Sequence, residues 1–328
     1  MIRFSDLSGG ESPRSLPPDP VLHPANSEAV EELYRRACET VAAAFEELGR
    51  QQLIDLPRIE QLALDLVEEF AADDRAGLRL VSQAYDPHQY LQRHSANVFL
   101  LVVKLARALE VGSEVLRQVG AGALLHDAGM LWVPEEVRDK PGRLSPSEER
   151  LVHTHPDRGR EAIVEVVRPP ALVATIVAQE HEQPDGRGYP HQLSREEIDP
   201  FARLVRVADF FEAYTHPRSY RPRGFPPTEA LRAIVRAAGG AFDPEMARLV
   251  LRELTIYPVG SVVELSTGEA AEVVATNSDH ILKPVVLVVR DAQGLPLAEP
   301  RLVDLAERPS LYIRGLGASD APPSGVAG

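Results

Sequence analysis

The stretch AGALLHDAG, Ala121–Gly129, places a histidine and an aspartate directly after an apolar helical segment. Neighbouring positions on a helix point about 100° apart, so His126 and Asp127 can reach one metal ion, or two neighbouring ions, from a single turn. An aspartate that caps or pairs at a helix end would give the same dipeptide. The stretch therefore predicts a helical fold with polar groups inside. Whether these groups form a metal site or cap a helix end depends on the residues elsewhere in the sequence.

The helical rhythm continues through residues 87–254. One apolar stripe recurs at three- and four-residue steps after His94 and ends before Gly112. The tetrapeptide Ser145–Glu148 has the pattern of a capping box with proline in the first turn, which predicts a helix start. No strand pattern is evident, so we predict an all-α domain. Further helices are predicted over 170–181, 200–214 and 228–238.

The flanking regions differ from this domain. Two helices are predicted before it, from Ser27 to Gly49 and from about Pro57, packed on the domain or on a second copy of the chain. After Ile256, valine-rich segments with turns at Thr267-Gly268 and Gln293-Gly294 predict a small antiparallel β unit. The fold class is mainly α. The expected divisions are a mobile arm 1–25, a helical region 26–86, a helical domain 87–254, a β-rich domain 255–314 and a mobile tail 315–328.

The composition excludes several classes of protein. The chain has 328 residues and a net charge of −14, which argues against binding to polymeric nucleic acid or to an anionic membrane surface. A small anionic ligand in a local cationic pocket stays compatible. A single cysteine, Cys38, forbids an intrachain disulfide and suits a reducing compartment. The sequence shows no signal peptide and no run of about 18 apolar residues. We therefore expect a soluble, cytoplasmic protein without membrane insertion.

Eight of the ten histidines lie between residues 88 and 216. His94 continues an apolar stripe, and alone it would more often be a core histidine than a metal ligand. His155 precedes Pro156, so we expect it to end a helix and face inward. Four others are expected to be bystanders: His88, His153, His191 and His216.

Acidic residues in apolar segments are the second signal. Glu180 and His181 close the segment ALVATIVAQ, where both are costly to bury unless they are paired or bound to a metal. Asp209 lies in a helix that is apolar on most faces and therefore needs a cation. That cation is either a metal ion or one of three arginines, at about even odds: Arg203, Arg206 and Arg218.

Together the candidates offer imidazole nitrogens and carboxylate oxygens without sulfur, a ligand set that suits Fe, Mn or Zn. Two ions a few ångströms apart lower the pKa of a shared water and polarise a phosphate oxygen, which is the chemistry of phosphoester hydrolysis. Nearby cationic residues fit an anionic substrate. They are Lys140, Arg187, Arg218 and Arg221.

An ordered set of motifs resembles the HD-GYP family of bacterial cyclic-di-GMP phosphodiesterases, a branch of the HD-domain phosphohydrolases. The resemblance covers about His94 to Pro244. The motifs are HSANV (94–98), LLHDAG (124–129), DKPGRLSPSE (139–148), HPDRG (155–159), EHEQPDGRGYP (180–190), RVADFFEAY (206–214), RSYR (218–221) and AFDPEM (241–246).

The resemblance implies an HD-type helical bundle that holds two divalent metal ions, Fe or Mn. It implies catalytic roles for His126 and Asp127, and phosphate binding by Arg218 and Arg221, to which we add Lys140. Tyr189 would line the substrate pocket or meet a partner protein. The expected metal ligands, with Glu180 added as a seventh, are His94, His126, Asp127, His155, Glu180, His181 and Asp209.

The chain also departs from the family pattern. Glu180 stands where the family has a histidine, and it adds a negative charge. Met130 replaces a lysine, which removes one cation near the phosphate. Tyr90 stands where some members have a glutamate that holds a third metal, which favours two ions. Pro184 alters the loop before the GYP segment.

Three functions remain open from the sequence. The first is a metal-dependent phosphodiesterase that hydrolyses cyclic-di-GMP to the linear dinucleotide, and whether it cleaves this product further to GMP is left open. The alternative is a degenerate, catalytically weak protein that acts as a cyclic-di-GMP sensor or as an adaptor for a diguanylate cyclase through the GYP loop. The third is an HD-type activity on another phosphoester. Formation of a homodimer is also left open.

Overall fold

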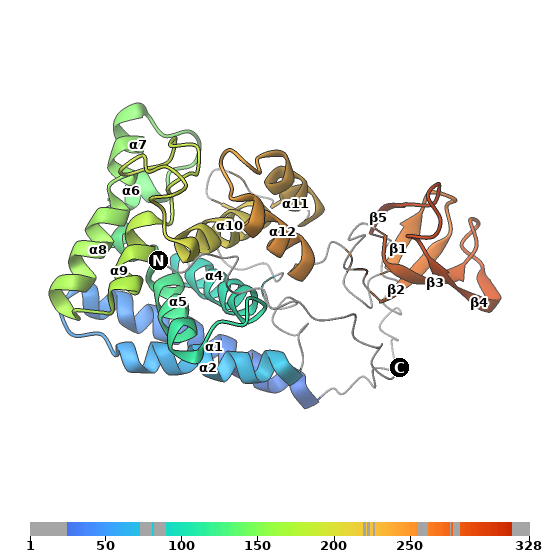
Figure 1. Ribbon diagram of the computed structural model, residues 1–328, viewed down its shortest axis with the longest axis horizontal. Coiled ribbons are helices and arrows are strands. Elements are labelled where there is room, and N and C mark those ends of the chain that lie inside the picture. Colours follow the sequence, from blue (N-terminus) through green and yellow to red (C-terminus); the bar gives the residue numbers. More distant parts are fainter. Residues whose placement is uncertain are drawn as a thin grey trace, which may run out of the picture. The chain divides into compact units, whose positions relative to one another are not determined.

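The computed structural model of the chain describes residues 25–72, 81, 90–218, 221, 224–225, 227–254, 257, 262–275, 277 and 283–316. The chain divides into two compact units, Met1–Glu253 and Leu254–Gly328 (Figure 1). The predicted arm and tail lie outside the described residues, except for residue 25 and residues 315–316. The same holds for much of 73–86, so the finer division of the chain stays a prediction.

The first unit is helical, as predicted (Figure 1). None of the helices that the structure describes is long and apolar enough to cross a membrane. The helices are α1 (Ala25–Gly49), α2 (Leu56–Ala72), α4 (Tyr90–Arg107), α5 (Ser113–Leu125), α6 (Glu135–Arg138), α7 (Pro146–Val152), α8 (His155–Val166), α9 (Ala171–Gln179), α10 (Pro200–Thr215), α11 (Pro227–Arg236), α12 (Pro244–Glu253) and the 3₁₀ helix η3 (Ala128–Trp132).

Helix α4 forms the centre of this unit. Its residues are buried almost without interruption from Leu91 to Ala106, because apolar side chains occupy nearly all of its faces. It packs against α1, α2, α5, α10 and α12. A histidine on such a helix lies inside the protein and not on its surface, which is the position of His94.

The start of α7 confirms the predicted capping box. The Ser145 hydroxyl accepts from the backbone nitrogen of Glu148, and the Glu148 carboxylate accepts from the backbone nitrogen of Ser145 at 2.7 Å. The expectation that His155 ends a helix was wrong, because α7 ends at Val152 and His155 begins α8. Pro156 lies in the first turn of α8, where its missing N–H has no intrahelical partner to lose.

Helix η3 lies directly against the start of α8 because two glycines let the backbones approach. A Cβ atom on Gly129 would lie 1.8 Å from the carbonyl oxygen of His155 and 2.7 Å from the nitrogen of Gly159. A Cβ on Gly159 would likewise lie 2.9 Å from the nitrogen of Gly129. This close approach brings the residues just before η3 next to His155.

The second unit is the predicted small antiparallel sheet. Its strands are β1 (Val262–Leu265), β2 (Ala270–Ala275), β3 (Val285–Arg290), β4 (Pro296–Asp304) and β5 (Ile313–Leu316), in the order β4-β3-β2-β1-β5. Alternate residues of β1 to β3 are buried, including Val263, Val273 and Val288. Gly268 and Gly294 have φ angles of +85° and +82°, which confirms both predicted turns.

The contact between η3 and α8 can be tested with a single methyl group. Gly129→Ala is expected to lower the free energy of unfolding by about 2–3 kcal/mol, because overpacking a tight contact forces the backbones apart. Gly112→Ala is the matched control, since Gly112 has a φ of −62° and no described atom lies within 4 Å of the added methyl. Urea unfolding of both variants measures the difference, and equal stabilities would contradict the packing described here.

Candidate metal centre

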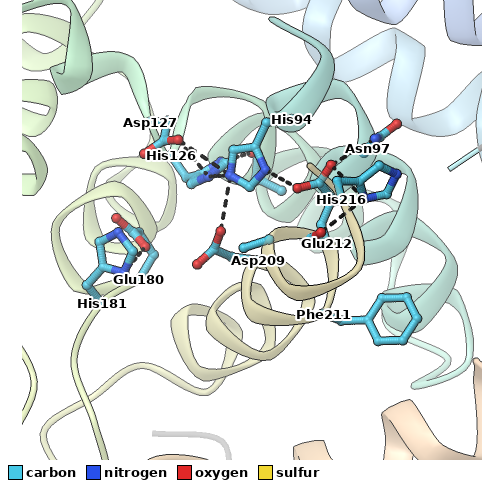
Figure 2. A network of polar contacts seen from close by, with 12 residues as sticks. His94, Asn97, His126, Asp127, Glu180, His181, Asp209, Phe211, Glu212 and His216 are labelled. Atoms are coloured by element: carbon cyan, nitrogen blue, oxygen red, sulfur yellow. Dashed lines mark hydrogen bonds and ion pairs between the residues drawn. The ribbon is translucent and has the colours of Figure 1, made fainter. Parts of the chain in front are cut away.

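Five segments of the helical unit bring the seven predicted ligands together. His94 comes from α4, His126 and Asp127 from the junction of α5 and η3, and His155 from the start of α8. The others are Glu180 and His181 at the end of α9, and Asp209 on α10. They form two groups with ligand atoms within 4.8 Å of one another, Asp127–His155–Glu180–His181 and His94–His126–Asp127. Asp209 adjoins the second group, with Oδ1 at 3.1 Å from Nε2 of His94 (Figure 2).

Asp127 belongs to both groups, and its two oxygens face different neighbours. Oδ1 lies 3.4 Å from Nε2 of His155. Oδ2 lies 3.4 Å from Nε2 of His94 and 3.6 Å from Nε2 of His126. A carboxylate in this position can hold one ion with each oxygen, which is the geometry of a bridging ligand.

Three imidazoles are oriented by hydrogen bonds on their far sides. Nδ1 of His126 donates to the carbonyl of Ala123 at 2.7 Å, and Nδ1 of His155 donates to the carbonyl of Val152 at 2.8 Å. Nδ1 of His94 donates to the carboxylate of Glu212. Each Nε2 is thereby left to face the centre, the arrangement that metal-binding histidines adopt in proteins.

Glu180 is fully buried, and burial raises its pKa to about 8, although His155 opposes this shift. Its Oε1 lies 3.0 Å from Nε2 of His155. Its Oε2 lies 3.1 Å from Nδ1 of His181 but has no hydrogen-bond partner among the described residues. A buried carboxylate oxygen without a donor is costly, and a divalent cation would compensate it. The nitrogen and oxygen donors around it fit such an ion.

Two kinds of cation were considered for Asp209, a metal ion or an arginine, and its neighbours in the structure bear on this choice. Burial alone would raise the pKa of Asp209. The hydrogen bond from His94 and the positive charge of protonated His94 outweigh burial and hold this pKa well below its usual range. Of the three arginines, Arg203 pairs with Asp243, Arg206 donates to the carbonyl of Ala241, and Arg218 lies 3.7 Å from Glu212. Asp209 thus faces the histidine cluster.

The ring of Tyr189 lies between the rings of two histidines. Its ring stacks on His153 at a centroid distance of 3.8 Å and on His181 at 4.6 Å. Two rings cannot both stack this closely on one face without overlapping, so they cover opposite faces of Tyr189. His153 was interpreted as a bystander, but the structure places it in this stack. Gly186, in the loop that leads to Tyr189, has a φ of +75°, a conformation that glycine adopts without strain.

The predicted substrate-binding cations have different surroundings. Arg218 lies over the ring of Tyr90, 4.0 Å from its centroid. Nη2 of Arg221 donates to the carbonyls of residues 213, 214 and 216 and thereby holds the end of α10. Nζ of Lys140 pairs with Glu148 at 2.7 Å, in the segment that leads into α7. Of these three, the structure brings Arg218 next to the histidine cluster, through Tyr90 and Glu212.

Three polar residues of the centre were missed by sequence reasoning. Glu212 is fully buried behind His94, where it also accepts from Asn97 at 2.9 Å and lies 3.2 Å from Nδ1 of His216 (Figure 2). His216 was expected to be a bystander, yet it is buried in this network. The signal for Glu212 was present, since it lies one helical turn after Asp209 in the same apolar helix.

Comparisons with known proteins give matches over both units of the chain. A family model described as HD domain matches residues 79–246, and a KOW domain associated with HD domain matches residues 262–316. The chain is 34% identical over 277 residues to a cyclic di-GMP phosphodiesterase of Pseudomonas aeruginosa, covering 83% of this chain and 65% of that one. It is 32% identical over 169 residues to 3'3'-cGAMP-specific phosphodiesterase 3 of Vibrio cholerae, covering 52% and 36%.

Among solved structures, an HDG"Y"P protein from Bdellovibrio bacteriovorus matches with a TM-score of 0.59 at 19% sequence identity. The match covers 69% of this chain and 71% of that one, and it shows the same fold. The chain spans less than two thirds of the length of the two curated relatives.

The shared position of Asp127 predicts how metal content depends on it. Asp127→Asn is expected to reduce bound Mn²⁺ at both positions, because the amide offers one neutral oxygen in place of two charged ones and can no longer serve both groups. Asp157→Asn is the control, since the side chain of Asp157 lies outside both groups of ligands and pairs at 3.5 Å with the exposed His191. Elemental analysis after dialysis measures the metal content. Full loading of the Asp127→Asn variant would contradict a bridging role.

Metal binding should also release a proton from Glu180. An acid with a pKa of about 8 is mostly neutral at pH 7, whereas a metal ligand must be ionised. Mn²⁺ affinity is therefore expected to rise with pH up to about 8. Calorimetric titration in two buffers of different ionisation enthalpy counts the protons, and the Glu180→Gln variant should release about one fewer than wild type. Equal proton release by both proteins would argue against Glu180 as a ligand.

Proposed function

Because the chain belongs to the HD domain family, we propose that it is a metal-dependent phosphodiesterase that hydrolyses cyclic-di-GMP to the linear dinucleotide. Further cleavage would give GMP as a second product. The relatives named cyclic di-GMP phosphodiesterases support this substrate class.

The observation that carries the proposal is the carboxylate of Asp127 between two groups of ligands. One ion would be held by His94, His126, Asp127 and Asp209, and the other by Asp127, His155, Glu180 and His181. Nitrogen and carboxylate donors without sulfur favour Fe or Mn. When bound, two such ions polarise a phosphate oxygen and lower the pKa of an attacking water.

The protein side chains have separate tasks in this reaction. Asp127 belongs to both groups, and His126 precedes it in the sequence, so these two residues would hold the reacting centre in place. Asp209 stays ionised near neutral pH, because His94 lowers its pKa. The carboxylate oxygen of Asp209 that does not face His94 would therefore be able to accept a proton from water. Burial of His155 and Glu180 keeps this side of the centre dry, which strengthens each electrostatic contact.

Phosphate recognition is assigned first to Arg218. Its guanidinium lies against Tyr90, which in turn stacks on His94 at a centroid distance of 5.2 Å. A phosphate held by Arg218 would therefore lie beside the ion at His94. Arg221 supports this segment through its three backbone contacts, and Lys140 would reach a phosphate only by leaving Glu148.

The stacking of Tyr189 limits what the GYP loop can do. With His153 and His181 on its two faces, the Tyr189 ring has no face left for a substrate base. It therefore would line the pocket with its edge, and a partner such as a diguanylate cyclase would contact the loop around it. A homodimer and a cytoplasmic location also remain predictions.

A sensor without catalysis is the second candidate, and one observation favours it. Tyr90 occupies the position of a third metal ligand in some relatives of the predicted family, and here it holds Arg218 by a cation–π contact. Met130 on η3 adds no charge near the phosphate. These residues would still allow cyclic-di-GMP to bind.

Turnover under controlled metal loading distinguishes the candidates. Protein loaded with Mn²⁺ or Fe²⁺ without oxygen is incubated with cyclic-di-GMP and, separately, with 3'3'-cGAMP, and products are separated chromatographically. We expect cleavage of cyclic-di-GMP and a loss of at least about 100-fold in kcat for Asp127→Asn, because electrostatic stabilisation of the transition state is lost. Asp157→Asn should match wild type.

Each of the other outcomes has a definite meaning. Preferred cleavage of 3'3'-cGAMP would keep the reaction but change the substrate. Full metal loading with tight cyclic-di-GMP binding and no product from either nucleotide would reject the enzyme and favour the sensor.

A further inference from the structure

A chain of hydrogen bonds runs from the metal centre to the N-terminal helix. His94 Nδ1 donates to Oε2 of Glu212 at 2.5 Å, and Nδ2 of Asn97 donates to Oε1 of the same carboxylate at 2.9 Å (Figure 2). The hydroxyl of Tyr34 then donates to Oδ1 of Asn97 at 2.7 Å. This series of hydrogen bonds thus connects α10 and α4 with α1.

The donors and acceptors along this chain agree with one another. The amide of Asn97 has one workable orientation, because its oxygen would repel the carboxylate of Glu212 if the group were flipped. This orientation presents Oδ1 to Tyr34, which must then donate. Burial raises the pKa of Tyr34 to about 12, so its hydroxyl keeps the proton that it donates.

Tyr34 lies outside the region that the HD domain model matches, residues 79–246. Its side chain is nevertheless buried, and α1 packs along α4. The guanidinium of Arg93, the residue before His94, lies 5.4 Å from the centre of the Tyr34 ring. Helix α1 therefore contacts the segment that carries His94 at two neighbouring points.

We propose that Tyr34 is a positioning residue, which acts through Asn97 and Glu212 to hold the ring of His94 with Nε2 directed at the centre. The N-terminal helix thereby sets the metal affinity of the group formed by His94, His126 and Asp127. This inference rests on the proposed metal binding, and it assigns a role to a helix that the family model does not include.

The expected effects decrease with distance from His94. A carboxylate behind a metal-binding histidine fixes the ring and raises its basicity, and its removal weakens metal binding by about 10–100-fold. Glu212→Gln should fall in this range. Tyr34→Phe removes one neutral hydrogen bond further out and keeps the ring, so about fivefold weaker Mn²⁺ binding is expected.

A double-mutant cycle on the full-length chain tests the connection. Mn²⁺ dissociation constants are measured by electron paramagnetic resonance for wild type, Tyr34→Phe, Glu212→Gln and the double variant. Once Glu212→Gln has interrupted the series of hydrogen bonds, Tyr34→Phe should weaken Mn²⁺ binding little further. The effects of the two substitutions on the dissociation constant should therefore be strongly non-additive. The same fivefold effect in both backgrounds, or no effect of Tyr34→Phe on Mn²⁺ affinity, would overturn the proposal.

A second variant separates positioning from packing. Phe45 is also buried on α1, so Phe45→Leu should lower the stability of the protein while its Mn²⁺ affinity stays that of wild type. If Phe45→Leu weakens Mn²⁺ binding as much as Tyr34→Phe, the effect comes from general loosening of the helix and the proposal fails.

A measurement without metal keeps this test independent of the proposed enzyme. In ¹⁵N-histidine-labelled, metal-free protein, the chemical shift of His94 Nδ1 reports its hydrogen bond to Glu212. Tyr34→Phe should change this shift, and Phe45→Leu should leave it unchanged. An unchanged shift in Tyr34→Phe overturns the inference, whereas a changed shift in a protein that cleaves no cyclic dinucleotide rejects only the proposed activity.

Discussion

The burial of acidic groups among histidines is the constraint on which the helical unit depends. Asp127, Glu180 and Glu212 have little or no exposure, and Asp209 is nearly buried beside them. Desolvation of a carboxylate costs several kcal/mol unless donors or cations compensate it. The histidines supply part of this compensation. The helices must therefore meet with their polar residues in register, since a small displacement would leave a buried charge without a partner.

The backbone provides this register at the ends of helices. His126 and Asp127 follow the last turn of α5, His155 begins α8, and Glu180 follows the last turn of α9. Nδ1 of His126 and Nδ1 of His155 each bond a carbonyl three residues earlier, so the local helix geometry orients the ring. The glycine contact between η3 and α8 fixes the distance between these ends.

Sequence patterns were sufficient for the helices and for the β unit, because periodicity is a local signal. They also selected polar residues that the structure brings together in two groups, because polar residue types in apolar segments are a local signal too. They failed where the partner is distant in the chain. His153 was dismissed because nothing local shows that Tyr189 stacks on it, 36 residues later. Arg221 shows a different limit, because its contacts to carbonyls five to eight residues earlier in the sequence form only once the end of α10 has folded. The hydrogen bond from Tyr34 to Asn97 joins two residues that are 63 positions apart in the sequence.

The charge of the centre gives a reason for two ions. Four carboxylates, those of Asp127, Glu180, Asp209 and Glu212, carry four negative charges when ionised, and neutral imidazoles add none. Two divalent ions would balance them, whereas one ion would leave two negative charges that repel a phosphodiester. With a histidine at position 180, as the resembled family has, two ions would leave one positive charge for the substrate. Glu180 would remove that charge, so in the proposed reaction attraction of the phosphate would depend more strongly on Arg218, which lies 3.7 Å from Glu212 at the edge of the same network.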